Sequence, residues 1–190
     1  MSARPPRVGA LSIVESARVT GGLRFVELSC YEALSLAATA ADGDDAPLAV
    51  FLAAAGLAHA WRAEQLAGLL PLSVGLPGAA ELTRAPSPAA AEALSLLAAA
   101  APAELAAVAL GALYPALAAA YELRSARAAP AADGPLLRVW RRVSADLAAV
   151  SGEGTSVLAT DRAGALAARL DALLEGGRAL LRGWTEEDGA

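Results

Sequence analysis

Alanine and leucine fill the long stretches of this chain that lie between its proline- and glycine-rich breaks. Both residues are strong helix formers, whereas aromatic residues make up only 4% of the sequence and β-branched residues are few. No stretch alternates apolar and polar residues over the length of a strand. The sequence therefore predicts an all-α protein, an antiparallel helical bundle.

The breaks indicate where the first helices begin and end. A first helical region, residues 11–41, contains Gly21 and Gly22, so we expect a short helix followed by a long one. Asp45 followed by Pro47 is typical of a helix start, because aspartate caps the free N–H groups and proline needs no hydrogen-bond partner in the first turn. We expect that second helix to end just before Pro71.

Residues 72–88 are rich in proline and glycine and predict a long crossover connection. Ser87 followed by Pro88 is again typical of a helix start. Later helices are expected over residues 88–100, 102–128 with a kink near Pro115, 135–151, and 161–183 with an apolar stripe of Leu166, Leu170, Leu173 and Leu174.

A chain of 190 residues is long enough for one domain with a substantial core and short for two. We expect a single helical-bundle domain over residues 9–184, with a flexible N-terminal tail at 1–8 and a flexible C-terminal tail at 185–190. The three tryptophans, Trp61, Trp140 and Trp184, are expected to anchor the core because each can bury a large apolar area.

Charge and cysteine content favour some kinds of partner and location over others. The net charge of −5 disfavours nucleic-acid binding, which needs a basic face, and the arginines of residues 138–143 fit an i,i+4 ladder from Arg142 to Asp146. Cys30 is the only cysteine, so no intramolecular disulfide can form, and we expect a small buried thiol and a cytoplasmic location. The uncharged runs are too short for a membrane span, so no membrane partner is expected.

Two segments share an order of features that suggests an internal repeat. Tyr31-Glu32 precedes Asp45-Ala46-Pro47-Leu48, and Tyr121-Glu122 precedes Asp133-Gly134-Pro135-Leu136. Coincidence in a low-complexity chain also explains the similarity, because Asp-x-Pro is a common helix start. If the repeat is genuine, a pseudo-twofold axis would place Glu32 and Glu122 opposite each other, as in a carboxylate-bridged di-metal centre.

The helical hairpin, the segment LAHAW, the long crossover, and a second hairpin with LYPALAAAYE and APAADGPLLRVWRRVSADLAAVSGEG together resemble the ferritin-like superfamily. The resemblance covers residues 20–183, and the chain looks more specifically like bacterial ferritin-like proteins grouped with tRNA hydroxylases. It implies a four-helix bundle with an additional terminal helix and a long crossover. It also implies a di-iron site built from two single glutamates and two Glu-x-x-His motifs.

Both paired motifs are incomplete in this sequence. The first reads Gly56-Leu57-Ala58-His59 and lacks the glutamate, and the second reads Asp146-Leu147-Ala148-Ala149 and lacks the histidine. The resemblance implies the metal ligands Glu32, His59, Glu122 and Asp146, and Glu27 competes with Glu32 for the first position. With one imidazole in the whole chain, we expect no cofactor, although iron or manganese would fit the carboxylates.

His59, the only histidine, allows three interpretations. It could be hydrogen-bonded in a polar pocket of the core, ligate a metal, or act as a general base or partner contact. Arg62, one helical turn later, could pair with a bundle carboxylate and supply the positive charge that a metal would otherwise provide.

Two functions remain open from the sequence. The first is a non-catalytic interaction or structural module that binds a protein partner or forms a homo-oligomer, because the ligand set is broken and apolar helix surface is abundant. The alternative is a non-haem metal-dependent oxidase or hydroxylase of the tRNA-hydroxylase-like type, with a carboxylate-rich site. The sequence contains no phosphate-binding loop and no Gly-x-Ser-x-Gly motif.

Overall fold

A computed structural model describes residues 12–41, 45–71, 75–154 and 164–181, and every regular element within these ranges is helical. The prediction of an all-α protein is confirmed. The elements in chain order are α1 (Ile13–Ala40), α2 (Ala46–Ala67), α3 (Ala79–Leu82), α4 (Pro88–Ala99), α5 (Pro102–Val108), a π-helical segment η2 (Ala109–Leu113), α6 (Tyr114–Arg127), α7 (Gly134–Gly154), α8 (Gly164–Leu174) and a 3-10 turn η4 (Arg178–Leu180).

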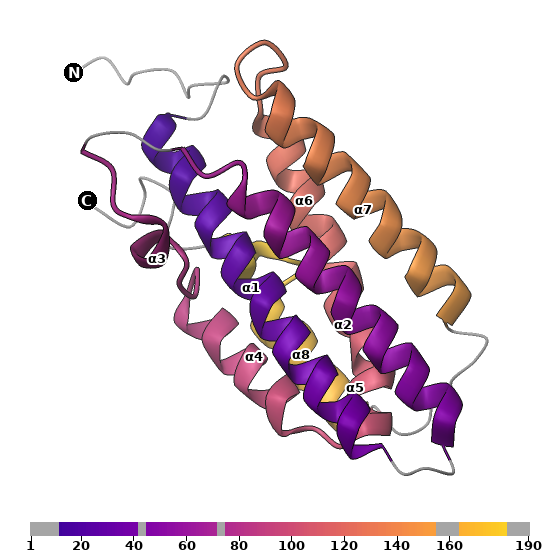
Figure 1. Ribbon diagram of the computed structural model, residues 1–190. Coiled ribbons are helices and arrows are strands. Elements are labelled where there is room, and N and C mark those ends of the chain that lie inside the picture. Colours follow the sequence, from indigo (N-terminus) through magenta and orange to yellow (C-terminus); the bar gives the residue numbers. More distant parts are fainter. Residues whose placement is uncertain (1–11, 42–44, 72–74, 155–163, 182–190) are drawn as a thin grey trace.

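Two antiparallel pairs of long helices form the body of the molecule (Figure 1). Helix α1 packs along α2, and α6 packs along α7. Helices α4 and α8 pack against each other, and α4 also contacts α1. One cluster of buried apolar side chains draws on α1, α2, α4–α8, η2 and η4, so these elements share a single main core.

Helix α1 is continuous through Gly21 and Gly22, so the prediction of a short helix followed by a long one is wrong. The physical reason is tertiary: a Cβ atom at Gly21 would lie 2.3 Å from the carbonyl oxygen of Leu82. The glycine lets the segment that carries α3 approach the backbone of α1. The start of α1 is fixed by a capping box in which the Ser12 hydroxyl accepts from the Glu15 N–H and the Glu15 carboxylate accepts from the Ser12 N–H.

Helix α2 begins after Asp45, with Pro47 in its first turn, as predicted. The Asp45 side chain nevertheless makes no capping hydrogen bond. Gly56 brings α2 close to α1, because a Cβ atom at this position would lie 2.9 Å from the Ser35 hydroxyl oxygen.

The connection between α2 and α4 contains α3 and ends at a cap that also fixes the C-terminal part of the chain. The Ser87 hydroxyl accepts from the Ala90 N–H at 3.0 Å, as expected for a helix start at Pro88. The same hydroxyl donates to the carbonyl oxygen of Ala179 at 2.7 Å. One buried side chain therefore starts α4 and holds η4 against it.

The interruption predicted near Pro115 takes the form of the π-helical segment η2, Ala109–Leu113. Proline has no N–H group to donate to the carbonyl of Gly111, four residues earlier, and its ring would collide with that carbonyl in a regular α-helix. The wider turn of a π-helix relieves both problems. The helical path from α5 to α6 thus continues through the proline.

The aromatic residues divide between core and surface. Trp140 is fully buried, as predicted, and Tyr114 and Tyr121 are buried with it. Trp61 is 39% exposed, so its prediction as a core anchor is wrong; the Arg142 guanidinium lies 4.8 Å from its ring centroid instead. Trp184 lies outside the described residues.

Among the described residues, two helical stretches, Ala46–Ala67 and Pro102–Arg127, are long and apolar enough to cross a membrane by length and composition. These helices are longer than the uncharged runs of the sequence because they also include charged residues. Only 33% of the apolar window of the first stretch is buried, against 67% for the second. The core helix of a soluble protein passes the same test, so this finding is weak evidence for a membrane.

Candidate functional site

A fully buried carboxylate, Glu27 on α1, lies at the centre of the most polar region of the core. His59 and Arg62 reach it from α2, and Tyr121 reaches it from α6. His59 and Arg62 can act together because an i,i+3 spacing places them on the same face of α2. We call these four residues the Glu27 cluster.

Each oxygen of the Glu27 carboxylate has its own partner. Oε2 lies 2.5 Å from Nδ1 of His59 and 3.9 Å from Nη1 of Arg62. Oε1 accepts a hydrogen bond from the Tyr121 hydroxyl at 2.7 Å. A buried charge is costly unless it is paired and hydrogen-bonded, and here three side chains share that task.

The pKa of the Glu27 carboxyl lies below its usual value of 4.5. Burial acts to raise this pKa, but the charge interaction and hydrogen bond with His59, the Arg62 guanidinium and the Tyr121 hydrogen bond together outweigh burial. Glu27 is therefore an ionised carboxylate, which can only accept. We accordingly assign the proton of the short contact to Nδ1 of His59, which acts as the donor.

The second ring nitrogen of His59, Nε2, takes no part in the contact with Glu27. Nε2 is buried and makes no hydrogen bond to any residue that the structure describes. The ring packs against Tyr114, with centroids 5.5 Å apart and a 46° tilt. A carboxylate that fixes one ring nitrogen and frees the other is the arrangement used both by histidine bases and by histidine metal ligands.

Other reactive groups near the cluster are held in their protonated forms. Burial, followed by the Glu27 charge, raises the pKa of the Cys30 thiol well above its ordinary value. Burial and the same charge also raise the pKa of Tyr121, and burial raises the pKa of Tyr114. Cys30 is thus a buried thiol, as predicted, and the thiolate needed for nucleophilic chemistry is disfavoured.

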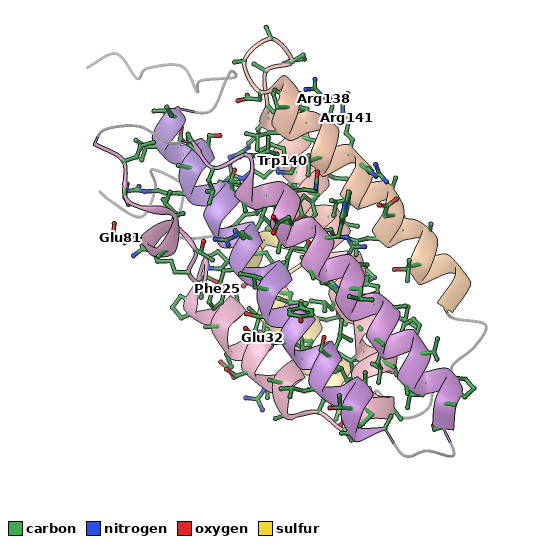
Figure 2. All side chains as sticks on the ribbon, viewed as in Figure 1. Phe25, Glu32, Glu81, Arg138, Trp140 and Arg141 are labelled. Carbon is green, nitrogen blue, oxygen red and sulfur yellow. The ribbon has the colours of Figure 1, made fainter. Side chains whose placement is uncertain are left out.

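The structure does not bring together the four residues that the resemblance suggested as metal ligands. Only His59 lies in the interior. Glu32 is exposed on α1 (labelled in Figure 2), Glu122 is exposed and accepts a hydrogen bond from the Ser144 hydroxyl at 3.1 Å, and Asp146 is partly exposed, 3.9 Å from Arg142 Nε. The last contact confirms the predicted i,i+4 pair on α7.

The choice between Glu27 and Glu32, which the sequence left open, is thereby settled. The two residues are five positions apart and so point about 140° away from each other around a helix. Glu27 faces the core and Glu32 faces outward. The Tyr-Glu repeat does not place equivalent residues opposite each other either, because Tyr121 is buried whereas Tyr31 is 37% exposed.

Within the described residues, no group of three or more histidine, cysteine, aspartate or glutamate side chains is arranged to hold a metal ion. Glu27 and His59 supply two possible ligands, and the third side chain beside them is Arg62, which cannot bind a metal ion. The sequence signal was Arg62 one helical turn after His59, a spacing that lets both side chains reach one carboxylate.

Comparison with other proteins adds no assignment: no family model, no curated protein and no solved structure matches this chain.

Proposed function

We propose that this protein is a ferritin-like helical module without catalytic activity, in which the Glu27 cluster replaces a di-metal centre. The observation that carries the proposal is the pairing of Glu27 with His59 and Arg62. A buried bridging carboxylate needs a positive charge beside it, and the Arg62 guanidinium supplies the charge that a metal ion supplies in di-iron members of that superfamily.

The arrangement of the helices supports the same proposal. One hairpin, α1–α2, is followed by a long connection and then by a second pair, α6–α7. Ferritin-like bundles also join two helical hairpins by one long crossover, and they build their sites from side chains on facing helices. Glu27, His59 and Tyr121 likewise meet from three different helices around the shared interior.

The chemistry of the cluster favours a structural role over a reactive one. The carboxylate already has three partners, the nearby thiol and phenols stay protonated, and a metal ion approaching Glu27 would have to displace the like-charged Arg62. Such a cluster fixes the register of α2 against α1 and α6, because only one alignment pairs every charge. The function of the module would then lie in its outer surface.

Metal content tests this proposal. Protein produced with added iron and manganese is expected to contain less than about a tenth of an equivalent of either metal by elemental analysis, because no open ligand set remains. His59→Ala should lower the free energy of unfolding and leave the metal content unchanged. Glu32→Gln, at an exposed position of the same helix as Glu27, is the control that should change neither.

The alternative is a non-haem metal-dependent oxidase or hydroxylase, and one observation favours it: Nε2 of His59 is buried without a partner among the described residues. If this nitrogen binds a metal, wild-type protein should purify with close to one equivalent of iron or manganese, and His59→Ala should abolish that metal content. This pair of results would refute the non-catalytic module.

A further inference from the structure

The outer face of α2 carries an exposed apolar stripe, at one end of which the Arg142 guanidinium of α7 lies 4.8 Å from the centroid of the Trp61 ring. Val50 is 68% exposed, Leu57 is 67% exposed and Trp61 is 39% exposed, and Ala54, between them, is exposed as well. In Figure 1, α1 and α2 form the near face of the molecule, and no helix lies in front of α2. Large exposed apolar side chains grouped on one face mark an interaction surface.

The spacing of the stripe is that of a helix–helix seam. Residues 50, 54, 57 and 61 follow one another at intervals of four, three and four, which is the alternation of the two core positions of a heptad. The sequence between Asp45 and Arg62 contains no aspartate, glutamate, lysine or arginine. This surface therefore has the pattern of a short coiled-coil interface, and its core positions lack the charges that would oppose burial.

The stripe is complementary to a reversed copy of itself. In an antiparallel pair about a twofold axis at the middle of the stripe, Val50 meets Trp61 of the second copy, and Ala54 meets Leu57. Each layer then combines a larger with a smaller side chain, which is how packed layers interdigitate without voids. An isologous contact of this kind needs only one surface patch, used twice.

Charge at the ends of the stripe fits the same register. One turn beyond Trp61, the exposed Glu64 would lie beside Pro47 of the second copy, in the first turn of its α2. The N-terminal N–H groups of that helix receive no hydrogen bond from the Asp45 side chain. A carboxylate beside a helix N-terminus is stabilising, so the antiparallel arrangement places an acceptor beside the first N–H groups of α2.

We infer that α2 is the interface of a symmetric antiparallel homodimer, with Val50, Ala54, Leu57 and Trp61 forming its seam. This inference rests on the proposed function as an interaction module and names its partner as a second copy of the chain. Because the seam is only four layers long, we expect a dissociation constant in the range of about 1–100 µM.

Sedimentation velocity over a concentration series tests the inference on the full chain. Wild-type protein is expected to pass from monomer to dimer within that range. Leu57→Glu, at the centre of the seam, should raise the dissociation constant by at least about 100-fold, because two copies of the side chain lose their burial at once. Leu123→Glu, an exposed leucine on α6, is the matched control and should dimerise as wild type does.

Circular dichroism verifies that the variants fold, and Val50→Glu provides a second disruption of the seam at a similarly exposed position. Monomeric wild-type protein throughout the series would overturn the inference. So would a dimer that persists in both seam variants. A monomer that binds vesicles of phosphatidylcholine and phosphatidylglycerol through Leu57 would also overturn it, since the stripe would then be a lipid-binding face.

Cysteine crosslinking tests the antiparallel register. Val50→Cys protein mixed with Trp61→Cys protein should form an intermolecular disulfide under mild oxidation. Val50→Cys alone should not, because the two copies of residue 50 would be separated by about 16 Å along the helix axis, well beyond disulfide reach. Crosslinking of Val50→Cys alone, as efficient as the mixture, would refute the register. Wild-type protein, whose Cys30 is buried, gives the background.

The metal and dimer experiments fail independently. Stoichiometric metal would refute the non-catalytic module even if the dimer forms. A metal-free monomer would leave that module standing and remove α2 as a self-interface.

Discussion

Replacing Glu27 with glutamine would remove the negative charge at the centre of the core and keep nearly the same shape. The amide oxygen of the new side chain could still accept the hydrogen bond from His59, and its NH2 group would then face the Tyr121 hydroxyl, whose oxygen can accept in place of donating. Arg62, which is 4% exposed, would lose its buried counter-charge. The main cost should therefore come from an uncompensated guanidinium.

The expected size of this effect is about 3–5 kcal/mol in the free energy of unfolding, the usual cost of removing one partner of a buried ion pair. It is large against the total stability of a domain, which is about 5–15 kcal/mol. Urea unfolding followed by far-UV circular dichroism, at one fixed protein concentration, measures it. Glu122→Gln is the control, because Glu122 is exposed and the change should cost less than about 1 kcal/mol.

A second substitution separates charge from packing. Adding Arg62→Met to Glu27→Gln removes the stranded cation, so the double variant should be more stable than Glu27→Gln alone by about 1–3 kcal/mol. The reasoning fails if the free energy of unfolding of Glu27→Gln stays within about 1 kcal/mol of wild type. It also fails if the effects of Glu27→Gln and Arg62→Met, each measured alone, simply add in the double variant. Either result would mean that the cluster contributes little through its charges.

Three further predictions concern stability. The folded pKa of Glu27 is below its usual value of 4.5, so ionised Glu27 contributes to the free energy of unfolding above that value, and this contribution is lost as the pH falls through the folded pKa. Urea unfolding from pH 7 to pH 3 should therefore show a smaller decrease in the free energy of unfolding for Glu27→Gln than for wild type. Gly21→Ala should destabilise the protein by about 2–4 kcal/mol, because its Cβ would meet the backbone of Leu82. The control Gly111→Ala has open space around it and should be neutral or stabilise the protein by up to about 1 kcal/mol. Thermal unfolding of both variants compares the two effects. Ser87→Ala should cost about 1–3 kcal/mol, because α4 loses its cap and the Ala179 carbonyl its donor, and should increase hydrogen exchange near η4; unchanged exchange there would contradict this role.

The sequence by itself determined the helical class of this protein and several helix boundaries. Helix propensity and capping depend on residues within one or two turns, so Ser87-Pro88 and Pro47 could be assigned from neighbours alone. Pro115 likewise indicated an interruption, because the missing N–H and the bulk of the ring act locally.

The tertiary structure decided which faces of the helices point inward. Alanine is tolerated both in the core and at the surface, so alanine-rich helices lack the sharp polar and apolar faces that would fix their rotation. The sequence therefore left open whether Glu27 or Glu32 faces the core, and only packing against α2 and α6 placed Glu27 inside. The exposure of Trp61 could not be predicted for the same reason, because it depends on which side of α2 meets α1.

Contacts between distant segments also had no local signal. Gly21 reads as a helix breaker until Leu82, more than sixty residues later along the chain, is found against it. His59 and Arg62 were recognisable as one face of a helix, but their shared carboxylate comes from another helix and its third partner, Tyr121, lies 94 residues from Glu27. Residue order fixes spacing along a helix, whereas the meeting of buried charges depends on how helices pack in three dimensions.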